Sequence, residues 1–150
     1  MNLWSVRSQA LAELQSNLKQ ENEILQEAFS LLDECIDRLY SCAIIENDNT
    51  RVAAVCYQTL VKARRLALGC FSLCLDGLVL EAGALMRPLK EAWQLLIYLH
   101  EQPERVESVL SDNPPRAGDI ARTINRELHN QLQGLTDYYN ANTSHISFKE

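Results

Sequence analysis

Charged side chains inside an apolar segment give the first candidate for chemistry in this sequence. Arg87 and Glu91 are four residues apart, so a helix would place them on one face. Charges in an apolar setting need partners, and the simpler interpretation is a structural ion pair between these two residues. The alternative is a cleft in which Arg87, Glu91 and His145 converge on a small anionic ligand, with Tyr138 or Tyr139 as a wall.

A resemblance to a known family runs through the same segment. The matching motifs are Leu85-Met86-Arg87-Pro88-Leu89-Lys90-Glu91, Tyr98-Leu99, Pro103-Glu104-Arg105, and Tyr139 with Ser144-His145. They resemble a family of uncharacterised bacterial helical proteins, in which a Leu-x-Arg-x-Leu-x-Glu helix is followed by a Tyr and a Ser/His element. The similarity covers roughly residues 60–146. Since that family has no assigned activity, the resemblance implies a helical fold and a grouping of Arg87, Glu91 and His145, but no reaction.

A second candidate is formed by Arg122 and His129, which are seven residues apart and would share a helix face. This spacing resembles the Arg…His signature on a late helix of HEPN-type helical ribonucleases. The resemblance implies that Arg122 would stabilise the phosphate while His129 acts in metal-independent acid–base cleavage across a dimer interface. The simpler interpretation is an exposed amphipathic helix on which the two residues have no shared role.

Other catalytic, cofactor and metal motifs are missing from the sequence. It contains no glycine-rich phosphate loop, no G-x-S-x-G, no H-E-x-x-H and no Glu-x-x-His pair of a di-iron bundle. The three histidines are far apart in sequence. The five cysteines include no C-x-x-C pair and are interpreted as buried thiols; they are Cys35, Cys42, Cys56, Cys70 and Cys74. We therefore expect no metal and no cofactor.

Composition and charge favour an all-α protein that binds neither nucleic acid nor membrane. Of 150 residues, 47% are hydrophobic and only 5 are Gly and 4 Pro, which is typical of helices. A net charge of −6 disfavours an extensive contact with nucleic acid. We expect the one basic doublet, Arg64-Arg65, to match acidic residues of the first helix.

The apolar stretch 66–86 is interrupted by Asp76, Gly77 and Glu81, which argues against a membrane span. Without a secretory signal at its start, the chain is expected to be cytoplasmic.

Apolar periodicity predicts a bundle of about five to six helices in one domain, residues 1–150. The first helix, without Gly or Pro, carries an uninterrupted heptad seam, and the helix over 78–100 is apolar nearly all round, which predicts a buried central helix kinked at Pro88. Asp119 is expected to cap a later helix. The predicted helices cover about 5–46, 51–75, 78–100, 103–111, 119–133 and 135–142.

The leading functional interpretation is self-association without catalysis. The N-terminal half of the seam presents Leu11, Leu14, Leu18 and Leu25 in a mostly polar setting, as in a projecting coiled-coil arm. We therefore expect a homo-oligomer, most simply a dimer, or a helix that docks a protein partner. The alternatives are the HEPN-like ribonuclease and the small-anion-binding domain described above.

Overall fold

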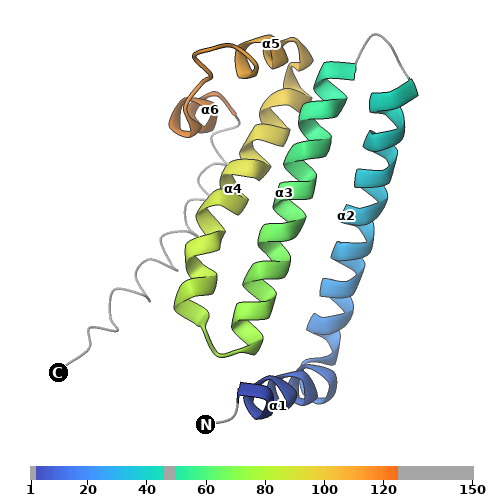
Figure 1. The fold of residues 1–150 in the computed structure, drawn as a ribbon, viewed down its shortest axis with the longest axis vertical. Helices are drawn as coiled ribbons and strands as arrows, with labels where there is room; N and C mark the ends of the chain where they lie inside the picture. The colour runs from blue at the N-terminus through green and yellow to red at the C-terminus, as the bar shows by residue number, and fades with distance from the viewer. Residues whose placement is uncertain (1–2, 46–49, 125–150) are drawn as a thin grey trace, which may run out of the picture.

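A computed structural model describes residues 3–45 and 50–124, and this part of the chain is helical, which confirms the predicted all-α class. Helices α2, α3 and α4 lie side by side in an up-down-up layer (Figure 1). Helix α1 crosses below this layer, while α5 and α6 lie at its opposite end. The elements are α1 (Leu3–Ser16), α2 (Lys19–Ile45), α3 (Thr50–Leu75), α4 (Val79–Glu101), the 3₁₀ turn η1 (Pro103–Arg105), α5 (Val106–Val109) and α6 (Ala117–Thr123).

The helix predicted over 5–46 is in fact two helices, because the chain bends at Asn17 and Leu18. The amides of both residues bond the Glu13 carbonyl, at 2.9 and 3.2 Å, which closes α1 with a wide turn. Ser16 bonds its hydroxyl to the Ala12 carbonyl at 2.8 Å. Short polar side chains that hydrogen-bond to nearby backbone can weaken a helix even where it contains no Gly or Pro. The absence of Gly and Pro had suggested one continuous helix.

The pairing of α2 with α3 is supported by opposite charge. Helix α2 has two basic and six acidic residues, a net charge of −4, whereas α3 has four basic residues and no acidic one, a net charge of +4. Arg64 of α3 forms a two-point ion pair with Asp33 of α2, in which Nη2 donates to Oδ2 at 3.1 Å. This contact confirms the predicted charge match for Arg64.

Among the described helices the central one is α3, which packs against both α2 and α4, whereas the sequence had predicted the 78–100 helix as the buried centre. Leu60 of α3 and Leu99 of α4 are both buried. Trp93 of α4, by contrast, is 51% exposed. Helix α4 is apolar nearly all round although it does not lie at the centre of the layer. Its inward face meets α3, its side meets α6, and part of its apolar surface stays open to solvent.

The turn between α3 and α4 is closed at Gly77, as the Asp-Gly signal predicted. Gly77 has φ +77°, its amide bonds the Cys74 carbonyl at 3.0 Å, and the Leu78 amide bonds the Leu73 carbonyl at 2.8 Å. These are the two bonds of a Schellman motif. Just before it, Asp76 receives Arg7 from α1, with Arg7 Nη2 donating to Oδ2 at 3.0 Å. This ion pair anchors α1 beneath the layer at the C-terminal end of α3, where a cation is favoured.

The remaining elements follow the predicted order with shorter helices. The segment predicted as a helix over 103–111 is a 3₁₀ turn followed by one α-helical turn that ends at Val109. Helix α6 begins at Ala117, so Arg116 is its N-cap and Asp119 is its third residue rather than the cap. The Asp119 carboxylate still helps to cap the helix, because it accepts a hydrogen bond from the Arg116 amide at 3.3 Å. The rest of the predicted 119–133 helix and the whole of 135–142 lie outside the described residues.

Candidate functional site

Three of the four predicted self-association residues line a recess formed within the chain, although Leu11 is still 37% exposed. Leu11 and Leu14 of α1 and Leu25 of α2 line a recess of about 280 Å³ together with Leu68 and Phe71 of α3. The bend at Asn17 interrupts the seam and turns α1 toward the lower part of the layer. The fourth predicted seam residue, Leu18, lies at the bend and is exposed.

A different apolar stripe remains open along α2, and we call it the outer stripe. The half-buried residues Leu25, Phe29 and Leu32 lie toward α3, and the outer stripe begins one residue before them, about 100° around the helix. Its large members, Ile24 and Leu31, are 59% and 56% exposed. The stripe repeats at spacings of four and three residues and consists of Ile24, Ala28, Leu31, Cys35, Arg38 and Cys42, all of them exposed.

The predicted Arg87–Glu91 pair is present, but it lies on the surface. Arg87 Nε donates to Glu91 Oε1 at 3.1 Å, and the Arg87 side chain is 80% exposed. An exposed pair four residues apart on a helix contributes only about 0.3–0.5 kcal/mol to stability. The other members of the predicted ligand cleft, His145, Tyr138 and Tyr139, lie outside the described residues.

The second predicted pair is described only in part. Arg122 is exposed and is held within its own helix, where Nη2 donates to Asp119 Oδ1 and Nε donates to the Gly118 carbonyl. His129 lies outside the described residues, so its pairing with Arg122 stays a prediction.

The prediction that all five cysteines are buried was wrong for three of them, since Cys35, Cys42 and Cys74 are exposed. Cys56 and Cys70 are half-buried, and burial raises the pKa of both thiols. Within 3–45 and 50–124 no group of three or more His, Cys, Asp or Glu side chains is arranged to hold a metal ion. No helix in these two ranges combines the length and apolarity of a membrane span.

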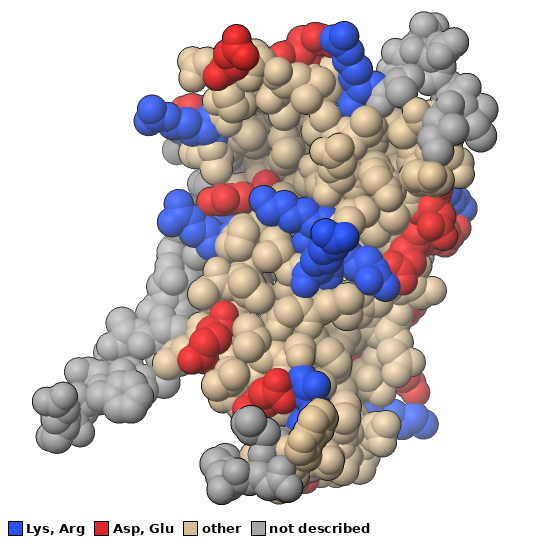
Figure 2. Space-filling model, viewed as in Figure 1, with Lys and Arg blue, Asp and Glu red and all other residues tan. Residues whose placement is uncertain are grey.

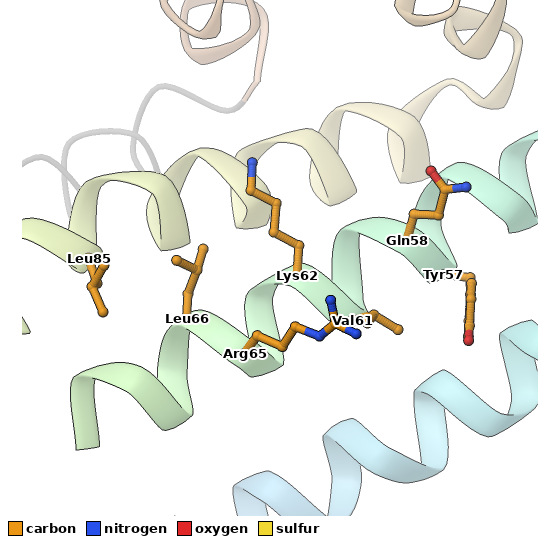
Figure 3. A pocket seen from close by; sticks show the side chains of 7 residues that line it. All are labelled: Tyr57, Gln58, Val61, Lys62, Arg65, Leu66 and Leu85. Atoms are coloured by element: carbon orange, nitrogen blue, oxygen red, sulfur yellow. The ribbon is translucent and has the colours of Figure 1, made fainter. Parts of the chain in front are cut away.

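A groove that the sequence did not single out lies on the face of α3 shown in Figure 3. It has a volume of about 430 Å³ and is bounded by Val61 and Leu66 of α3 and Leu85 of α4. Two cations, Lys62 and Arg65, rise beside it, and Figure 2 shows Lys and Arg gathered across the middle of this face. The sequence signal was a pair of cations three residues apart on a helix without acidic residues.

A second recess adjoins this groove and shares Lys62 with it. It has a volume of about 220 Å³ and lies between α3, α4 and the segment that leads into α6. Glu91 of the surface pair, Thr59 and the fully buried Gln94 contribute its polar lining. Lys62 therefore stands between a recess with a carboxylate and a groove with none.

Comparison of the chain with protein-family models, with curated proteins and with solved structures finds no match.

Proposed function

We propose that this protein is a non-catalytic self-association module that forms a homodimer through the outer stripe of α2. The observation that carries the proposal is the exposure of Ile24 and Leu31 at heptad spacing on a helix whose adjacent face is already packed on α3. Large apolar side chains that repeat every three to four residues form the seam of a coiled coil. An exposed stripe of this kind, apolar except for Arg38, is typical of an interaction surface.

The spacing of the stripe favours a second copy of the same helix as the occupant. From Ile24 to Cys42 the intervals are four, three, four, three and four residues, so the stripe reads the same in both directions. An antiparallel pair with its two-fold axis near Asp33 therefore places Leu31 opposite Cys35 of the partner subunit, and every stripe position opposite another. Such a self-complementary surface is what a two-fold dimer requires.

Charge selects the antiparallel over the parallel arrangement. In the antiparallel register Arg38 lies opposite Ala28 of the partner subunit and next to the partner's Glu27. In a parallel pair Arg38 would instead lie opposite Arg38 of the partner subunit, which places two like charges in the seam. Since each α2 has a net charge of −4, the two copies repel each other at long range. Salt screens this repulsion, so association is expected to strengthen as ionic strength rises.

The test compares two substitutions at equally exposed apolar residues. Leu31→Glu, on the stripe, is expected to convert the dimer to a monomer in sedimentation equilibrium, because it places a carboxylate in the seam. Val79→Glu is the matched control: Val79 is also 56% exposed but lies on α4. It is expected to leave the dimer intact.

Two results would contradict the proposal: a wild-type protein that stays monomeric up to high micromolar concentration, or a Leu31→Glu variant that still sediments as a dimer. Circular dichroism should show the same helicity in all three proteins. Leu14→Glu distinguishes the outer stripe from the predicted seam, because Leu14 lines the recess between α1, α2 and α3. It is expected to lower the midpoint of unfolding, and not to dissociate the folded dimer in sedimentation equilibrium.

A further inference from the structure

The two cations beside the 430 Å³ groove differ from their neighbours on α3. Arg64 is paired with Asp33 and Arg51 with Glu107. Lys62 and Arg65 have no ion pair or hydrogen bond with any residue in the described part of the chain. In a protein with 20 acidic and 14 basic residues, two neighbouring cations that form no ion pair with a described carboxylate are unexpected. They leave a local positive charge at the edge of the groove.

The groove itself combines this charge with an apolar wall. Val61, Leu66 and Leu85 line its floor and the side toward α4, while Tyr57 closes one end. Tyr57 is held there by the ring of Tyr40 from α2, with 5.5 Å between the ring centroids. Figure 3 shows Lys62 reaching toward α4 and Arg65 running along α3 toward Val61. The cations therefore flank the apolar surface from two directions.

We propose that this groove binds a soluble amphipathic carboxylate, a small molecule with a short apolar chain and one terminal carboxylate. The chain would lie against Leu66 and Leu85, and the carboxylate would take the counter-charge position between Lys62 and Arg65. Arginine and lysine both donate charge-assisted hydrogen bonds to carboxylates. The volume of about 430 Å³ falls within the roughly 300–1,000 Å³ typical of small-molecule sites.

The neighbouring recess helps to fix the orientation of this ligand. Glu91 lines the recess that shares Lys62 with the groove, so a ligand carboxylate is repelled from that side. The favourable position for the anionic end is therefore the Arg65 side of Lys62. The groove does not include the outer stripe of α2, so ligand binding and self-association can succeed or fail independently.

The experiment is calorimetric titration of the full chain with octanoate, 1-octanol and acetate. Octanoate is expected to bind, 1-octanol to bind at least tenfold more weakly because it lacks the charge, and acetate to give no measurable binding because it lacks the chain. The double variant Lys62→Gln/Arg65→Gln is expected to weaken octanoate binding about tenfold, which corresponds to about 1.4 kcal/mol. Binding to the wild type should also weaken as salt is added.

The matched control is Arg51→Gln/Arg122→Gln, which removes the same amount of positive charge from two exposed residues outside the groove. It is expected to bind octanoate like the wild type. The proposal is overturned if the wild type does not bind octanoate, if 1-octanol binds equally well, or if both double variants bind with the same affinity. All these side chains are exposed, so equal thermal midpoints should show that each variant is folded.

Discussion

Replacing Gly77 by alanine tests whether the turn below the layer depends on a backbone conformation that only glycine adopts easily. Gly77 has φ +77°, and its amide makes one of the two closing bonds of the Schellman motif at the end of α3, while the Leu78 amide makes the other. Space is not the obstacle, because an added Cβ would lie 4.0 Å from Val6 Cγ1. The cost is conformational: an L-residue pays about 1–2 kcal/mol in this region. Alanine recovers about 0.4–1 kcal/mol by restricting the unfolded chain. The expected net loss is about 1 kcal/mol in the free energy of unfolding.

The assay is urea unfolding followed by far-ultraviolet circular dichroism, with Gly69→Ala as the comparison. Gly69 lies in the interior of the same helix, where alanine is favoured over glycine by about 1 kcal/mol. Its new Cβ would meet Leu85 Cδ1 at 3.0 Å, and that methyl group can move into the adjoining groove. Gly77→Ala should therefore unfold at a lower urea concentration than the wild type, and Gly69→Ala at an equal or higher one. Equal midpoints for the two variants would refute the reasoning.

Two further predictions concern the pH dependence of stability and the reactivity of the thiols. The hydrogen bond and charge of Arg64 hold the pKa of Asp33 below its usual value, so this carboxylate stabilises the fold fully above about pH 3.9, the unfolded value, and loses that contribution as pH falls through the lowered native pKa. The difference in unfolding midpoint between the wild type and Asp33→Asn should therefore shrink on acidification, and a difference that stays constant down to the most acidic pH at which the wild type remains folded would contradict this. In thiol labelling, Cys35 on the outer stripe should become protected as protein concentration rises, while Cys74 of α3, which is also exposed, should react at one rate throughout; Cys56, whose pKa is raised by burial, should react more slowly than either. Protection of Cys35 and Cys74 to the same extent would argue against the α2 interface.

Much of the fold could be predicted because helices respond to short-range patterns. Apolar spacing and the Asp76-Gly77 turn placed α3 and α4 within about one residue of their observed bounds. The bend at Asn17 was not foreseen, because a polar Ser-Asn pair only weakens a helix. Whether the helix breaks there depends on what Leu11 and Leu14 gain by packing near α3. The stabilisation from this packing comes from contacts between helices that are distant in the sequence, so the local sequence does not predict it.

The candidate site was less predictable, because exposure depends on how the helices are arranged. Arg87 and Glu91 were paired as their spacing suggested, but the pair is exposed since α4 is not the central helix. The doublet Arg64-Arg65 was interpreted as one charge match, yet only Arg64 is directed at α2 and paired there. Adjacent helical residues point about 100° apart, so the two arginines have different surroundings. The outer stripe shows the same effect, since Ile24 is open while Leu25 lines the recess.

The separation of charge between α2 and α3 also affects how the molecule approaches other charged bodies. Helix α2 forms one edge of the layer and has a net charge of −4, and the adjacent α3 has +4, so the pair forms an electric dipole directed across the helix axes. In the field of a positively charged surface, such a dipole turns the α2 edge forward before contact. Retention of the monomer on an anion-exchange column should therefore depend on a few carboxylates of α2, such as Glu23 and Glu27, more than on the net charge of the whole chain.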